Sequence, residues 1–98
     1  MKNNYKFRAN HFYQLLETQD YTCPLSGRKL TPENTTAEHI IPLQAGGVHE
    51  LSNIYLIHKD VGRIKRHLSE ADVVRLAFDI LQTNGKKYGF QAKAILKR

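Results

Sequence analysis

The residues best suited to chemistry lie in one stretch of the chain, residues 37–65. It opens with a short apolar run that carries Glu38 and His39, passes through the double glycine Gly46-Gly47, and resumes as an apolar run that begins at Asn53. A basic segment of helical character follows. This order predicts a strand, a loop, a second strand and a helix. Where a strand ends beside the start of a helix, a carboxylate and an imidazole could hold a metal ion and activate water.

The stretch resembles the ββα-metal fold of HNH endonucleases, which reads Asp-His-Ile-(Ile/Val)-Pro, then Gly-Gly, then an Asn before a strand, then Lys-Asp-Val-Asn-Arg-x-Lys. The likeness covers roughly residues 23–68, including the lead-in Cys-Pro-Leu-Ser-Gly-Arg-Lys-Leu. It implies an α+β fold class: a small ββα-metal (HNH-type) core at about residues 36–68. An N-terminal helix and C-terminal helices would pack on that core, in a single domain spanning residues 1–98.

The resemblance implies a role for each residue at a family position. His39 matches the general base, Glu38 matches the acidic metal ligand, and Asn53 matches the asparagine that braces the loop holding the base. The family's second protein ligand, an Asn or a His, falls on Gly62, which has no side chain to offer a metal. Asp60 is a candidate substitute ligand.

Gly62 leaves several alternatives open. Water or a side chain such as Asp60 could complete the coordination shell of a Mg²⁺ ion, which often relies on few protein contacts. The loss could instead leave a DNA-binding domain with a defective site, or the residue could have been introduced on purpose. Because glycine costs about 1 kcal/mol relative to alanine inside a helix, we expect a reason for it beyond packing.

The reaction that the resemblance implies is hydrolysis of DNA phosphodiester bonds. Neutral His39 would take a proton from the attacking water, and a divalent ion would offset the charge that develops on the phosphate oxygens. The expected ion is Mg²⁺, with Mn²⁺ as a substitute. We expect the DNA backbone to be contacted by three basic residues, Arg63, Lys65 and Arg66.

Composition favours a polyanionic partner. The chain has a net charge of +6 and a pI near 9.6, and each Lys or Arg placed against a phosphate releases condensed counterions. Many small proteins are basic for other reasons, so charge adds little weight by itself. The single cysteine, Cys23, excludes an internal disulfide and a paired-cysteine zinc knuckle. We therefore expect no structural zinc and a small buried thiol at Cys23.

Hydropathy predicts a soluble, cytosolic protein without a membrane partner. No apolar run approaches the roughly 20 residues that cross a bilayer, and the polar start, residues 1–4, lacks the hydrophobic segment of a signal peptide. An HNH domain of this size suits bacterial, phage, restriction and mobile-element settings alike. The pattern does not indicate an oligomeric state.

Apolar spacing predicts the elements around the core. A first helix is expected over residues 7–19, strands over residues 36–43 and from Ile54, and a basic helix over residues 59–67. Ser69 has the character of an N-cap and predicts a helix from there to about Gln82. The apolar face of this helix is broad, so we expect it to pack in the core. A final short helix is indicated by Ala92, Ile95 and Leu96.

Each feature also has a simpler explanation. A Glu-His pair on a strand is usually a surface pair, a lone Asn before a strand is usually a turn residue, and a basic helix usually has a solvated face. Strand alternation also directs Glu38 and His39 to opposite faces, so a site that uses both needs a distorted strand end.

The joint order of the features nevertheless favours a metal-dependent HNH endonuclease. The alternatives are a catalytically inactive ββα module that binds nucleic acid or protein, and an inhibitor or scaffold whose basic surface meets an acidic partner.

Overall fold

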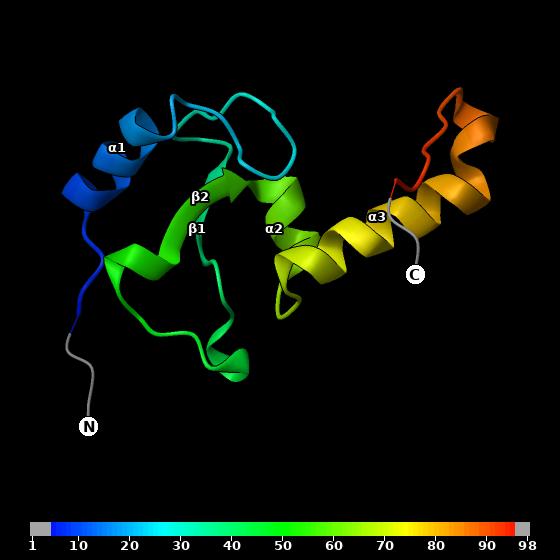
Figure 1. The fold of residues 1–98 in the computed structure, drawn as a ribbon. Helices are drawn as coiled ribbons and strands as arrows, with labels where there is room; N and C mark the ends of the chain where they lie inside the picture. Colours follow the sequence, from blue (N-terminus) through cyan, green and yellow to red (C-terminus); the bar gives the residue numbers. More distant parts are fainter. Residues whose placement is uncertain (1–4, 96–98) are drawn as a thin grey trace.

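The computed structural model describes residues 5–95 and has an α+β fold (Figure 1). Its helices and strands follow one another as α1 (Ala9–Thr18), β1 (Thr35–His39), β2 (Ile54–His58), α2 (Lys59–Lys65) and α3 (Glu70–Asn84). Three short 3₁₀ turns occur at Leu43–Ala45, Leu51–Asn53 and Gly85–Tyr88. The predicted α+β class is confirmed, with a strand-strand-helix unit between an N-terminal helix and a C-terminal helical segment.

The sheet consists of two antiparallel strands, with Thr35 opposite His58 and His39 opposite Ile54. β1 is shorter than the predicted strand over residues 36–43, since it ends at His39. The chain bends there because Pro42 has no N–H to donate to a ladder, and the 3₁₀ turn begins at the following residue.

The side chain of Gln19, at the end of α1, takes the place of a third strand beside β2. Its Nε2 donates to the carbonyl oxygen of Leu56 at 2.8 Å, and its Oε1 accepts from the N–H of Leu56 at 2.8 Å. A buried strand edge with unpaired backbone groups is costly. Gln19 therefore connects α1 to the sheet by hydrogen bonds as well as by packing.

The core is small and lies between α1, the segment before β1, and β2. It contains six buried side chains: Leu16, Cys23, Leu30, Tyr55, Leu56 and Ile57. Cys23 is a buried free thiol, as its position before the turn predicted. Four consecutive residues of β2 are buried, so this strand is covered on both faces.

α3 does not pack into this core, and the prediction that its broad apolar face would do so is wrong. Figure 1 shows α3 projecting away from the sheet, beginning near α2 and ending at the last 3₁₀ turn. None of its residues is buried. Periodicity shows that a helix has an apolar face, but it does not show which partner covers that face. The N-cap prediction is confirmed, since the Oγ of Ser69 accepts from the N–H of Asp72 at 3.1 Å.

The C-terminal segment differs from the expected short helix. Residues 90–95 have no regular secondary structure, because Gly89 ends the preceding 3₁₀ turn in a left-handed conformation at φ 86°. The rest of that prediction, at Leu96, lies outside the described residues, as does the polar start at residues 1–4. Within residues 5–95, no helix combines the length and the apolar character that crossing a bilayer requires.

Candidate functional site

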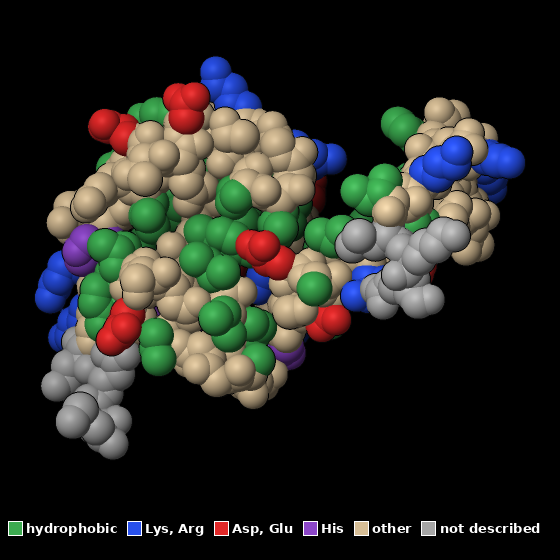
Figure 2. All heavy atoms as spheres, viewed as in Figure 1, with side chains coloured by type: hydrophobic (Ala, Val, Ile, Leu, Met, Phe, Trp, Pro, Cys, Tyr) green, Lys and Arg blue, Asp and Glu red, His purple; other side chains and the backbone are tan. Residues whose placement is uncertain are grey.

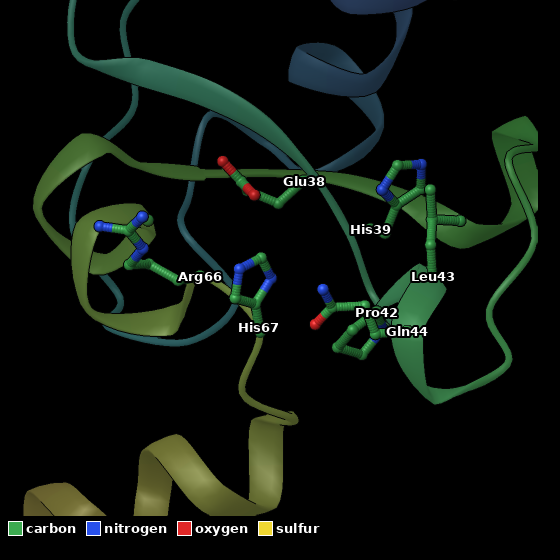
Figure 3. A pocket seen from close by; sticks show the side chains of 8 residues that line it. Glu38, His39, Pro42, Leu43, Gln44, Arg66 and His67 are labelled. Carbon is green, nitrogen blue, oxygen red and sulfur yellow. The ribbon is translucent and has the colours of Figure 1, made fainter.

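A hollow of about 430 Å³ lies beside α2 at the end of β1 (Figure 3). Its lining includes four residues predicted for the site, Glu38, His39, Gly62 and Arg66, together with His67. Figure 3 shows the side chains of Glu38 and His39 leaving β1 in different directions, as alternation along a strand requires. Both nevertheless reach the hollow, because His39 is the last residue of the strand.

Asn53 joins the two sides of the loop between the strands. Its Oδ1 accepts from the N–H of Ile41 at 2.9 Å, and its Nδ2 donates to the carbonyl oxygens of Ile41 at 3.0 Å and Val48 at 2.8 Å. Asn53 is only 7% exposed. An amide can donate and accept at once, so this one side chain satisfies three backbone groups of the loop that follows His39.

His39 is held from two directions. The Nζ of Lys65 donates to its backbone oxygen at 3.0 Å, and its Nε2 lies 2.9 Å from the Nδ1 of His49. One of these two ring nitrogens donates and the other accepts, so the contact is lost when both rings are cationic. Burial first, and then His49 and Lys65, lower the pKa of His39 below its ordinary value, while Glu38 opposes the shift.

We expect the protein to lose stability as the pH falls through the acidic range. Below pH 6.5, roughly the ordinary pKa of an imidazole, the unfolded chain takes up a proton that folded His39 resists until a lower pH. The free energy of unfolding should therefore decrease from neutral pH downward and level off above it. Urea unfolding at about pH 7.5 and about pH 5.5 would measure this slope, which the variant His39→Gln should reduce.

The matched control for that prediction is His67→Gln, which removes an exposed imidazole from the same hollow. This variant should keep the slope of the unmodified protein. Equal slopes for His39→Gln and the unmodified protein would show that His39 is not the group responsible.

Glu38 and Gly62 do not provide a donor set that fits a magnesium ion. The Oε2 of Glu38 accepts from the hydroxyl of Thr36 at 3.2 Å, and Gly62 contributes no donor. Across residues 5–95, no group of three or more His, Cys, Asp and Glu side chains is placed to hold a metal ion. Magnesium prefers several oxygen ligands in octahedral geometry. The expected Mg²⁺ or Mn²⁺ site therefore has no support in this arrangement.

Gly62 has a packing reason after all. A Cβ at this position would lie 2.8 Å from the Cγ2 of Thr36 and 3.5 Å from the Oε2 of Glu38. α2 thus crosses β1 so closely that a side chain would overlap a neighbour on the strand. The expectation that Gly62 needs an explanation other than packing is wrong.

The predicted substitute ligand, Asp60, lies away from the lining of the hollow. Its carboxylate pairs with Arg28 at 3.1 Å and with Arg63 at 2.7 Å. It stands in the first turn of α2, where a negative charge complements the helix dipole, and its N–H donates to the Nδ1 of His58 at 3.1 Å. Asp60 therefore stabilises the N-terminal turn of α2.

The three basic residues expected to contact DNA separate in the structure. Lys65 is 1% exposed and donates to the backbone of His39, so it has no free surface for a phosphate. Arg63 pairs with Asp60, whereas Arg66 is exposed at the hollow with a φ of 41°. The helical pattern placed Lys65 on the basic segment but did not reveal that its side chain turns inward.

Two histidines of this region were missed by sequence reasoning. His49 comes from the loop and contacts His39, and its ring also meets the edge of Tyr5 at a centroid distance of 5.4 Å. His67 lines the hollow just beyond α2. His49 lies in a segment without periodicity, and His67 lies at the end of the predicted basic helix but beyond the last residue of α2. Only the path of the loop and the turn after α2 therefore bring them to this site.

No family model matches the chain. The chain is similar to the cell division protein SepF of Latilactobacillus sakei subsp. sakei (strain 23K), with 29% identity over 98 residues that include 93% of this chain. The chain spans 64% of the length of that relative.

This similarity contradicts the prediction of an HNH endonuclease. The similar protein is named for cell division, and the match extends along nearly the whole chain. The predictions of a DNA-hydrolysing enzyme, of DNA as the partner, of metal binding, and of a phage or mobile-element setting are accordingly corrected. A short strand-turn-helix motif specifies an arrangement of backbone, and the same arrangement can serve unrelated functions.

Proposed function

We propose that this protein is a non-catalytic protein-interaction component of the cell division apparatus. The observation that carries this proposal is α3, a helix that projects from the body with an uncovered apolar face. The similarity to a cell division protein supports the setting. The proposal places the protein in the cytoplasm, which suits a chain with one unpaired cysteine.

The uncovered face is defined by exposed aliphatic side chains. Leu76 is 41% exposed and Ile80 is 54% exposed, and Ala77, on the same side of the helix, is exposed as well. In Figure 2 hydrophobic side chains continue from the body onto the projecting segment. Isolated exposed aliphatic residues are ordinary, but a row of them on one helix is typical of a surface that meets another protein. α3 therefore supports an interaction function.

The proposal is tested by locating the protein in dividing cells. A fluorescent fusion expressed in Latilactobacillus sakei, the organism of the similar protein, should gather at the division site. The double variant Leu76→Ser/Ile80→Ser should be diffuse, because it removes apolar surface without touching the core. The control Ile64→Ser, which changes an equally exposed side chain on α2, should localise normally. Diffuse fluorescence of the unmodified fusion would refute the proposal.

A further inference from the structure

The projecting helix carries one apolar stripe that the described chain leaves exposed beyond its first residue. Its members are Val73, Leu76, Ala77 and Ile80, which share one side of the helix through spacings of three and four residues. Val73 is half-buried at the start of the helix, while the other three are exposed. We call these four residues the α3 stripe. A 15-residue helix is roughly 22 Å long, so the stripe suits another helix of similar length.

A second face of α3, on the side of Val74, meets the C-terminal segment of the chain. A hollow of about 740 Å³ there is shared between α3, through Val74, Phe78 and Asp79, and the C-terminal segment, through Lys93 and Ile95. Figure 1 shows this segment returning alongside α3. The chain's own C-terminal segment thus meets the Val74 side of the helix and leaves the α3 stripe free.

The charges of α3 differ from those of the rest of the chain. The helix holds three acidic residues and one arginine, a formal charge of −2, in a chain whose net charge is +6. Asp72 and Asp79 are seven residues apart, and both border Leu76 along one edge of the α3 stripe. Within residues 5–95 neither carboxylate has a hydrogen bond or an ion pair. Asp79 also lines the hollow that contains Lys93, but no ion pair joins the two, so both carboxylates of this edge can accept a cationic partner.

We infer that the α3 stripe binds an amphipathic helix of a partner protein whose apolar face is bordered by Lys or Arg. Apolar side chains of the partner would cover Leu76, Ala77 and Ile80, and its cations would lie against Asp72 and Asp79. This inference rests on the proposed interaction function and deepens it by naming the chemistry of the partner.

Two other occupants fit the charges less well. An antiparallel pair of α3 helices from two copies would bring the acidic edge of one against the same edge of the other, and a parallel pair would bring it against the apolar side at Val74. Neither gives Asp72 and Asp79 a cation. An anionic lipid surface would repel both carboxylates. A basic amphipathic helix of another protein would both cover the apolar side chains of the α3 stripe and pair with the carboxylates along its edge.

Two synthetic helical peptides test the inference. Each has about 18 residues with Leu on one face; one carries Lys at the borders of that face, and its twin carries Glu. By fluorescence anisotropy, the Lys peptide should bind at least about tenfold more tightly than the Glu peptide. The preference is diagnostic because the net charge of +6 favours the Glu peptide.

Variants locate the binding. The double variant Leu76→Ser/Ile80→Ser should lower the affinity for the Lys peptide about tenfold. The double variant Asp72→Lys/Asp79→Lys should reverse the preference, so that the Glu peptide binds more tightly. Ile64→Ser, on α2, should bind like the unmodified protein, since Ile64 and Ile80 are both 54% exposed. Circular dichroism should show the same helix content in all of them.

Other outcomes would overturn the inference. Equal affinity for both peptides, or binding that survives Leu76→Ser/Ile80→Ser, would refute it. Self-association in sedimentation that Ile80→Ser abolishes would identify a second copy as the occupant. Binding to phosphatidylglycerol vesicles through the α3 stripe would identify a lipid surface. Division-site localisation without any preference between the peptides would refute this inference alone and leave the proposed function standing.

Discussion

The variant Asn53→Ala should lose a large part of the stability of the domain. Asn53 is 7% exposed, and its amide serves three backbone groups, two on Ile41 and one on Val48. Alanine would leave those groups without the partner that now satisfies them. A buried unsatisfied group costs about 1–3 kcal/mol, so we expect a total loss on the order of 3–4 kcal/mol. The total free energy of unfolding of a small domain is about 5–15 kcal/mol.

Urea unfolding followed by circular dichroism measures this loss. Asn53→Asp keeps the acceptor for the N–H of Ile41 but places a carboxylate oxygen against the carbonyl oxygens of Ile41 and Val48, so it should be at least as destabilising as Asn53→Ala. Asn84→Ala, at the exposed end of α3, is the control and should change the free energy of unfolding little. A loss below about 1 kcal/mol for Asn53→Ala would show that solvent replaces the amide.

The second large effect is expected at Gly62. Adding a Cβ by Gly62→Ala would bring it to 2.8 Å from the Cγ2 of Thr36. Thr36 is β-branched and its hydroxyl holds Glu38, so it cannot easily turn aside. Overpacking of this kind costs about 1–3 kcal/mol, against a gain of about 1 kcal/mol in helix propensity. We expect net destabilisation, and a larger one for Gly62→Asn.

A double-mutant cycle tests the cause of that effect. Thr36→Ser removes the crowded methyl group and keeps the hydroxyl that Glu38 accepts from. In this background Gly62→Ala should cost at least about 1 kcal/mol less than in the unmodified protein. The control Thr83→Ala, on the exposed part of α3, measures the gain in helix propensity from alanine at a position without crowding. Additive effects of Thr36→Ser and Gly62→Ala would show that the two residues do not clash.

Local patterns predicted the elements well and their environments less well. Ser69 marked the start of α3, and apolar spacing marked α1 and α2, because capping and periodicity are properties of neighbouring residues. The same periodicity predicted that α3 would be buried, and the structure shows it uncovered. Burial depends on what packs against a helix, which its own sequence does not contain.

The candidate site shows the same division. The order of Glu38, His39, Asn53 and Gly62 was visible in the chain, and the structure brings all but Asn53 to the lining of one hollow. A family resemblance predicted that this hollow is the active site of an HNH endonuclease. The similarity to a cell division protein contradicts that prediction. Motif order reflects how a chain folds locally, whereas activity depends on which donor atoms converge.

By itself, the amino-acid sequence determined the α+β class, the strand-strand-helix order and the turn at Gly46-Gly47. Gly46 has a left-handed φ of 94°, and a Cβ on Gly47 would overlap the carbonyl of Ile41, so both positions need glycine for local reasons. Only the tertiary structure decided that Lys65 turns inward and that α3 stands free. Those outcomes depend on contacts between segments distant in the chain, and no local pattern encodes them.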